Sequence, residues 1–239
     1  MNINETLKHY FGYDSLRPGQ QELIEGILQR KDVLGIMPTG AGKSLCYQVP
    51  ALMLDGITIV VSPLISLMTD QVKALNQAGV HAAYINSSLT DNQIRTALFY
   101  AAQGRYKIIY VAPERLNTIR FLEFACQVDI SMVTVDEAHC ISQWGQDFRP
   151  SYVGIADFLA QLPKRPVVSA FTATATERVK QDIMKSLRLQ NPVTVVTGFD
   201  RLNLFFRAVT RKGGKEKDNS ILNYVKKHED ESGIIYCAT

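Results

Sequence analysis

Residues 33–44 read VLGIMPTGAGKS, the stretch from which the fold can be deduced. Its apolar beginning, Val33–Met37, has the composition of a buried strand, and Lys43–Leu54 has the periodicity of a helix. Gly40 and Gly42 lie between them and allow backbone N–H groups to point inward. The helix N-terminus adds the positive end of its dipole. A strand, a glycine-rich turn and a helix in this order predict a phosphate-binding loop.

The loop matches the motif G-x-x-x-x-G-K-[ST] at every position but the first, where Met37 stands in place of glycine. In such loops the lysine, here Lys43, reaches the β- and γ-phosphates of a nucleoside triphosphate. The hydroxyl of Ser44 is placed to ligate Mg²⁺. We therefore expect ATP and Mg²⁺ as cofactors. The expected contacts of the loop come from Thr39, Gly40, Ala41, Gly42, Lys43 and Ser44.

Two adjacent carboxylates end a second apolar strand, Met132–Asp136. We expect Asp136 to hold the magnesium ion, directly or through water, and Glu137 to act as general base toward the attacking water. With Lys43 these residues form the predicted catalytic set. His139, close behind them, is expected to link the carboxylates to neighbouring motifs.

Short β-branched runs alternate with longer helical patterns along the chain. Strands are expected at Val33–Met37, Thr58–Ser62, Ala82–Ile85, Lys107–Ala112, Met132–Asp136, Val167–Thr172 and Val193–Thr197. Helices are expected at Gln20–Gln29, Lys43–Leu54, Leu64–Ala78, Asp91–Ala102 and Glu177–Leu187. This alternation predicts an α/β fold with a mostly parallel sheet and helices on both faces.

The composition excludes several other classes of protein. Of the 239 residues 46% are hydrophobic and 21% are charged, so the chain is not intrinsically disordered. Twenty-six basic residues minus twenty-three acidic ones give a net charge of +3, too small to indicate a polyanionic partner by itself. No apolar run approaches the roughly 18 residues of a membrane span, and the N-terminus has no secretory signal. We expect no membrane association.

The cysteines are widely spaced and form no C-x-x-C pair; they are Cys46, Cys126, Cys140 and Cys237. This distribution argues against a disulfide scaffold and against a zinc site. We expect reduced thiols and a cytoplasmic protein.

The composition changes after about residue 198. The stretch Arg201–Lys217 holds six basic residues against one acidic residue, and a helical pattern at Ser220–His228 and an apolar strand at Gly233–Cys237 follow. A lone strand cannot satisfy its own backbone hydrogen bonds. We therefore expect residues 1–198 to form one lobe and residues 199–239 to be a linker and the truncated start of a second. Whether this segment folds back, pairs with another copy or moves freely is open at this stage.

The loop and the carboxylates together resemble superfamily 2 helicases of the DExH type, and further motifs resemble the RecQ family of DNA helicases. Phe11–Tyr13 followed by Leu16–Gln20 resembles the nucleotide-recognition motif 0 of that family, with Leu16 where phenylalanine is frequent. The resemblance implies that Tyr13 and Arg17 pack on the adenine ring and that Gln20 hydrogen-bonds its edge. Aromatic, guanidinium and amide groups suit those contacts.

Residues 141–150, ISQWGQDFRP, resemble the aromatic-rich loop that follows the carboxylates in RecQ proteins, with Gln146 where histidine is expected. Trp144 and Phe148 offer ring faces to unpaired bases, and Arg149 offers a mobile charge. Since the loop begins close to Glu137, DNA binding there could act on hydrolysis.

Other motifs occur in the family's order. Ser62–Leu67 resembles motif Ia, Asn86-Ser87 motif Ic, Ala112–Leu116 motif Ib and Ala170–Ala175 motif III. Phe199–Asn203 resembles the junction to a second lobe, and Ser232–Cys237 the start of motif IV. The DNA-binding or coupling residues implied by the resemblance are Ser62, Pro63, Asn86, Arg115, His139, Gln143, Trp144, Phe148, Arg149, Thr172 and Thr174.

The resemblance implies the RecA-like, ATP-binding lobe of a 3′–5′ DNA helicase that couples Mg–ATP hydrolysis to movement on single-stranded or partial-duplex DNA in repair and recombination. The resemblance also leads us to expect that this chain lacks the rest of the second RecA-like lobe, with its arginine finger, and that it hydrolyses ATP very slowly and does not unwind duplexes. Two alternatives are a DEAD-box-type RNA helicase lobe, disfavoured by Trp144 and by Thr172, and a non-enzymatic nucleotide- or DNA-binding module, disfavoured by the unpaired strand.

Overall fold

The computed structural model describes residues 1–145, 147–198, 205, 207–210 and 213–236. These residues fall into two units, which span residues 1–199 and 200–239 and are described separately. The first unit contains the predicted sheet and the predicted site.

A seven-stranded sheet with the order β3-β4-β2-β5-β6-β1-β7 forms the centre of the first unit. Every strand pair in it is parallel, as the alternation of strands and helices predicted. The strands are β1 (Val33–Ile36), β2 (Ile57–Val61), β3 (Ala82–Ile85), β4 (Ile108–Val111), β5 (Ile130–Val135), β6 (Val167–Thr172) and β7 (Val193–Val196). Each coincides with a predicted strand to within two residues at either end.

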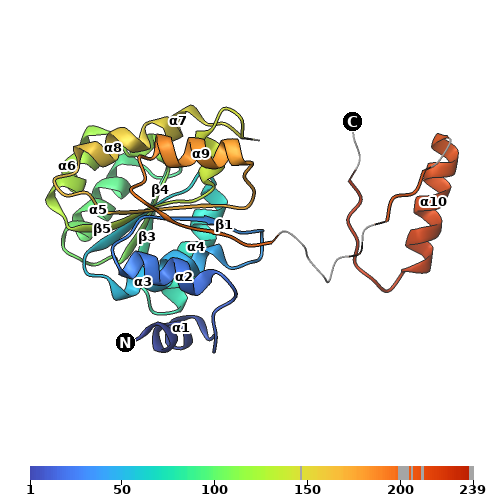
Figure 1. Cartoon of the computed structure of the whole chain (residues 1–239), viewed down its shortest axis with the longest axis horizontal. Helices are drawn as coiled ribbons and strands as arrows, with labels where there is room; N and C mark the ends of the chain where they lie inside the picture. Colours follow the sequence, from blue (N-terminus) through green and yellow to red (C-terminus); the bar gives the residue numbers. More distant parts are fainter. Residues whose placement is uncertain (146, 199–204, 206, 211–212, 237–239) are drawn as a thin grey trace. The chain divides into compact units, whose positions relative to one another are not determined.

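Helices cover both faces of the sheet (Figure 1). The helices of this unit are α1 (Ile3–Phe11), α2 (Gln20–Leu28), α3 (Lys43–Met53), α4 (Ile65–Gln77), α5 (Asp91–Ala102), α6 (Ile119–Gln127), α7 (Pro150–Val153), α8 (Ile155–Gln161) and α9 (Glu177–Ser186). Two 3₁₀ turns, η1 (Pro113–Arg115) and η2 (Ala138–Ile141), follow β4 and β5. In Figure 1 α2 and α3 lie on one side of the sheet and α6, α8 and α9 on the other.

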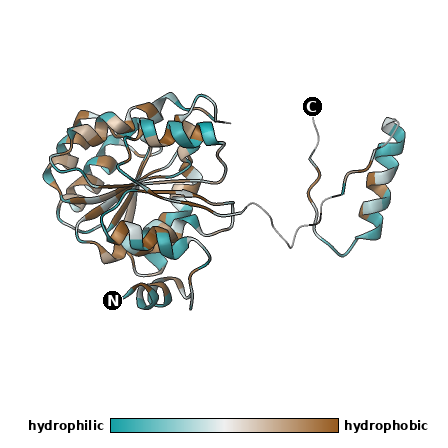
Figure 2. Cartoon of the chain, in the orientation of Figure 1, coloured by the Kyte–Doolittle hydropathy of each residue, from teal (hydrophilic) through white to brown (hydrophobic). Residues whose placement is uncertain are grey.

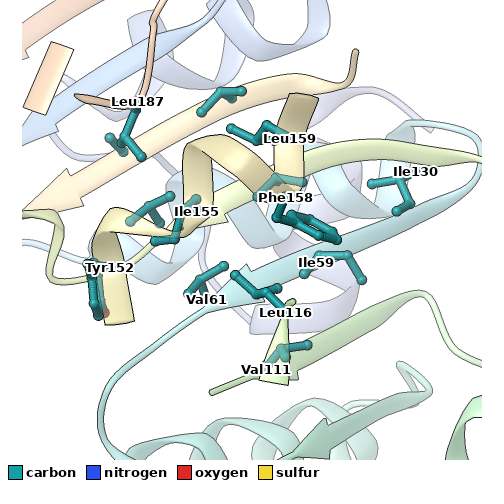
Figure 3. Close-up of a cluster of buried hydrophobic side chains, with 14 of the residues drawn as sticks. Ile59, Val61, Val111, Leu116, Ile130, Tyr152, Ile155, Phe158, Leu159 and Leu187 are labelled. Atoms are coloured by element: carbon teal, nitrogen blue, oxygen red, sulfur yellow. The ribbon is translucent and has the colours of Figure 1, made fainter. Parts of the chain in front are cut away.

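Alternate residues of the strands enter two different hydrophobic layers. Ile59 and Val61 of β2 pack in the layer that also contains Phe158 of α8, whereas Val60 packs against the layer of α2, α3 and α4. Figure 3 shows Ile59 and Val61 close to Phe158. This is the period-two alternation of a strand buried on both faces. Hydrophobic colouring accordingly concentrates between the helical layers in Figure 2.

Asp32, directly before β1, holds three strand ends together. Its carboxylate is 2% exposed and accepts hydrogen bonds from Arg165 Nη1 and Nη2 at 3.1 and 2.5 Å. The backbone N–H groups of Val168 in β6 and Gln190 before β7 donate to the same carboxylate at 2.9 and 2.7 Å. These hydrogen bonds hold β6 and β7 on either side of β1, the strand that leads into the phosphate loop.

The second unit contains α10, which spans Gly214–Lys227 and begins earlier than the helix expected at Ser220–His228. The predicted strand Gly233–Cys237 is wrong for its described part, since residues 233–236 form no strand and Ile234 and Tyr236 are exposed. A β-strand needs a neighbouring strand to receive its backbone hydrogen bonds, and none of the described residues forms one beside residues 233–236. Cys237 and the predicted junction at residues 199–203 lie outside the described residues.

We predict that Asp32→Ala lowers the free energy of unfolding by about 3 kcal/mol, because Arg165, whose side chain is 34% exposed, and two backbone N–H groups lose their buried acceptor. Urea denaturation followed by circular dichroism measures the change. The control is Asp14→Ala, which removes an ion pair with Lys8 whose side chains are 81% and 73% exposed. That variant should lose less than about 1 kcal/mol, and equal losses would contradict the role given to Asp32.

Candidate nucleotide and nucleic-acid site

The phosphate loop has the backbone that its glycines permit. Gly40 and Gly42 have φ angles of +83° and +82°, and Gly42 caps the N-terminus of α3. A Cβ atom on Gly42 would lie 2.5 Å from the side-chain nitrogen of Gln20, so a larger residue is excluded there. Met37, which replaces the first glycine of the motif, is fully buried in the hydrophobic layer of α3. Its side chain therefore leaves the loop open.

A cleft of about 600 Å³ brings together most of the predicted nucleotide-binding residues. Its lining includes Tyr13, Arg17, Gln20, Thr39, Gly40, Gly42, Lys43, Ser44, Asp136 and Glu137. These residues come from the segment before α2, the phosphate loop and the end of β5. Of the predicted loop contacts, Ala41 does not line the cleft. Gln48 and Gln71 do line it, and they were not predicted from the sequence.

Arg17 and Gln20 hold the phosphate loop itself. Arg17 Nη1 donates to the carbonyl oxygen of Gly40, and Gln20 Nε2 donates to those of Ala41 and Gly42, both at 3.1 Å. Gln20 Oε1 accepts from the backbone N–H of Arg17 at 2.8 Å. Both side chains therefore brace the loop in this structure, and their contact with adenine stays a prediction. Tyr13, also predicted for the base, is 51% exposed beside them.

Asp136 is a buried carboxylate with few donors. It is 6% exposed, and its Oδ1 accepts from the backbone N–H of Glu137 at 3.0 Å. Burial, and next the neighbouring charge of Glu137, raise the pKa of Asp136 to about 6. Glu137 itself adopts a left-handed backbone with φ of +48°, a strained conformation that is frequent at functional sites. A carboxylate in this setting attracts a cation.

Ser44 and Asp136 line the same cleft. Within the described ranges, no group of three or more His, Cys, Asp or Glu side chains is placed to hold a metal ion. Magnesium is usually bound through one or two carboxylates together with substrate phosphates and water, so this sparse donor set fits that ion.

His139 lies between the carboxylates and β6. Its Nδ1 is 3.3 Å from Glu137 Oε2 and 2.9 Å from the hydroxyl of Thr172. That hydroxyl donates its only proton to the carbonyl oxygen of Thr174 at 3.1 Å, so the proton between His139 and Thr172 belongs to His139. His139 therefore lies between the carboxylates and motif III, with a hydrogen bond to Thr172 and a contact with Glu137.

The aromatic-rich loop exposes its rings at the carboxyl edge of the sheet. Trp144 is 61% and Phe148 is 36% exposed. Arg149 donates to Asp147 Oδ2 at 2.8 and 3.0 Å and to the carbonyl oxygen of Pro63 at 3.2 Å. The loop is thus tied to the segment after β2. Gln143 is exposed on the same loop, and Gln146 lies outside the described residues.

The other predicted nucleic-acid residues differ in exposure. Ser62 and Asn86 are buried, and Asn86 accepts hydrogen bonds from Ser88, so these two shape the turns after β2 and β3. Arg115 lines a separate cavity of about 300 Å³ with Arg120. Thr174 lines another, of about 310 Å³, with His139 and Trp144. All of them follow strand ends, where ligands of open α/β sheets bind.

Two residues of α9 that contact the aromatic-rich loop were missed from the sequence. Arg178 Cζ is 3.5 Å from the centroid of the Trp144 ring, and Asp182 accepts from the hydroxyl of Ser142 at 2.6 Å. Their spacing of four residues places them on one face of a helix. That pattern is common on solvent-exposed helices, so no local signal marked them.

The sequence profile of the DEAD/DEAH box helicases matches residues 17–183. The chain belongs to this family. Among its helicase relatives, the ATP-dependent DNA helicase RecQ of Bacillus subtilis is 51% identical over 98% of this chain and 39% of its own length. RecQ of Pasteurella multocida is 43% identical over 98% of this chain and 36% of its own length. The chain thus spans less than half the length of these relatives, and the resemblance to RecQ DNA helicases is confirmed.

The fold is also that of a helicase lobe. The helicase domain of Pyrococcus furiosus Hef superposes with a TM-score of 0.60 over 82% of this chain and 40% of that protein, at 19% identity. This likeness confirms the RecA-like α/β architecture. The described residues contain no helix long and apolar enough to cross a membrane.

We predict that Asp136→Asn stabilises the nucleotide-free chain in EDTA at pH 8 but not at pH 4. The pKa of Asp136 is raised from 3.8 to about 6, so the group favours folding when protonated, and this contribution is lost as the pH rises through 6. Each pKa unit corresponds to about 1.4 kcal/mol, so the gain at pH 8 is at most roughly 3 kcal/mol. Urea denaturation at both pH values measures it. Asp70→Asn, at an exposed position of α4, is the control, and parallel profiles for the two variants would contradict the prediction.

Proposed function

We propose that this chain is the nucleotide-binding lobe of a RecQ-type helicase that hydrolyses Mg–ATP to move 3′–5′ along single-stranded DNA. The observation that carries this proposal is the single cleft that contains Arg17, Lys43, Asp136 and Glu137. The relatives named as RecQ DNA helicases support DNA as the substrate and, by their likeness, a role in DNA repair and recombination. The scattered thiols support a cytoplasmic location.

The chain's own residues would act as follows. Lys43 Nζ donates a hydrogen bond to the carbonyl oxygen of Met37 at 3.2 Å. With ATP bound, the same ammonium group would donate to the β- and γ-phosphates. Ser44 and Asp136 would hold the magnesium ion, which neutralises developing charge on the phosphates. Glu137 would accept the proton of the attacking water, and its contact with His139 keeps the carboxylate oriented.

Single-stranded DNA would lie along the carboxyl edge of the sheet. Trp144 and Phe148 offer stacking faces, and Arg115 offers a charge to the phosphates. A second RecA-like lobe, which we propose as a partner of this one, would complete the cleft and supply the arginine that stabilises the transition state.

We predict that Lys43→Ala weakens binding of a fluorescent ATP analogue to the 239-residue chain by about tenfold or more, because the phosphates lose a charge-assisted hydrogen bond. Equilibrium titration in the presence of Mg²⁺ measures it. Lys31→Ala removes an exposed lysine outside the cleft and should bind like the unaltered chain. Equal affinities of both variants, or no effect of EDTA on the unaltered chain, would overturn the proposed nucleotide site.

Glu137→Gln separates binding from chemistry. We expect the slow hydrolysis of radiolabelled ATP by this chain to fall by roughly 10²-fold, the usual contribution of a general base. Binding of the fluorescent analogue should change less than about twofold, because glutamine keeps the shape of the side chain. Unchanged hydrolysis in this variant would argue against the assigned base and for a module that only binds nucleotide.

A further inference from the structure

The guanidinium of Arg178 covers one face of the Trp144 ring. Its Cζ atom lies 3.5 Å from the ring centroid, well within the roughly 6 Å reach of a cation–π contact. Trp144 is nevertheless 61% exposed, so the opposite face and the edges of the ring are open to solvent. The indole is held from one side and presented on the other.

A second contact from α9 fixes the base of the same loop. The hydroxyl of Ser142 donates to Asp182 Oδ2 at 2.6 Å and accepts from the backbone N–H of Trp144 at 3.2 Å. Asp182 lies one helical turn after Arg178, so both contacts come from one face of α9. The backbone and the ring of Trp144 are therefore positioned by the same helix.

We propose that Arg178 is a positioning residue, which holds the Trp144 indole so that its open face stacks on an unpaired base of single-stranded DNA. This inference rests on the proposed function. An exposed tryptophan without such a contact samples several rotamers, and its ordering then opposes binding. Arginine suits the task because its planar guanidinium lies flat on an aromatic ring, which the ammonium of lysine cannot do.

The cavity beside Trp144 indicates why the orientation of the ring matters. This cavity, of about 310 Å³, is also lined by His139 and Thr174. His139 contacts Glu137 Oε2 at 3.3 Å. A base stacked on a correctly held indole therefore lies close to His139, which is in contact with the proposed general base.

A double-mutant cycle tests this role in the 239-residue chain. Binding of fluorescein-labelled (dT)₁₆ is measured by anisotropy at low salt for Trp144→Ala, Arg178→Ala and the double variant. We expect Arg178→Ala to weaken binding about threefold to fivefold, in the range of an exposed cation–π contact. The double variant should bind within about twofold of Trp144→Ala, because Arg178 acts through the ring. Arg178 is exposed, so its replacement leaves the core intact.

The matched control is Lys185→Ala, which removes the same charge from the same helix two turns away, at an exposed position. It should change affinity less than about twofold. Arg178→Lys should recover only part of the loss, although it restores the charge. The slope of affinity against salt should be the same for Arg178→Ala and the unaltered chain, whereas a lost phosphate contact would reduce it by about one.

Trp144 is the only tryptophan of the chain, so its fluorescence reports this site alone. Without DNA, acrylamide, which is uncharged, should quench Arg178→Ala more strongly than the unaltered chain, because the second ring face becomes accessible. Three results would overturn the role of Arg178 while the proposed function stands. They are additive losses of affinity in the double variant, a smaller salt dependence of binding for Arg178→Ala, and unchanged affinity and quenching for that variant. Failure of the unaltered chain to bind (dT)₁₆ at all would instead overturn the DNA-binding part of the proposed function, and with it this role.

Discussion

Hydrogen bonds at Thr172 join the phosphate loop to the carboxylates. The backbone N–H of Met37 donates to the carbonyl oxygen of Thr172 at 3.0 Å, and His139 contacts the hydroxyl of the same residue at 2.9 Å. Thr172 ends β6, which lies between β5 and β1 in the sheet. Because all three strands are parallel, their carboxyl ends reach one edge together, and segments far apart in sequence meet there. The site therefore depends on this strand order.

The sequence predicted those parts of the structure that local patterns specify. Buried β-branched runs identified the strands, and the phosphate loop and the carboxylates were recognisable because their chemistry is confined to a few adjacent residues. Helix α1 was not assigned, although the capping box of Asn2 and Glu5 marks its start. The start of helix α6 carries a weaker sequence signal, since the side chain of Thr118 forms no N-cap hydrogen bond. The strand expected at the C-terminal end was wrong because strand formation needs a partner that is not encoded locally.

Two buried aspartates show why the energetics of the site could not be predicted from residue types. Asp32 accepts from Arg165 and from two backbone N–H groups, so its charge is compensated and it stabilises the sheet. Asp136 accepts one backbone hydrogen bond at its side chain and lies beside Glu137, and its pKa is raised. The first arrangement is typical of a structural ion pair, the second of a group reserved for a ligand. Residue type does not give this difference, because the donors around Asp32 and the burial of Asp136 come from the tertiary fold.

The aromatic-rich loop is held at several points, and this restricts how a ligand on it can act. Its first residue, Ile141, belongs to the turn η2 that carries His139, and Arg149 ties its far end to Pro63. Helix α9 holds its middle through Ser142 and Trp144. These contacts hold the loop at residues on both sides of Trp144. Because η2 follows Glu137 directly, the contacts of His139 with Thr172 and Glu137 are the parts of the proposed hydrolysis site nearest to this loop in sequence. A ligand that shifted His139 would therefore alter the surroundings of the carboxylate proposed as general base.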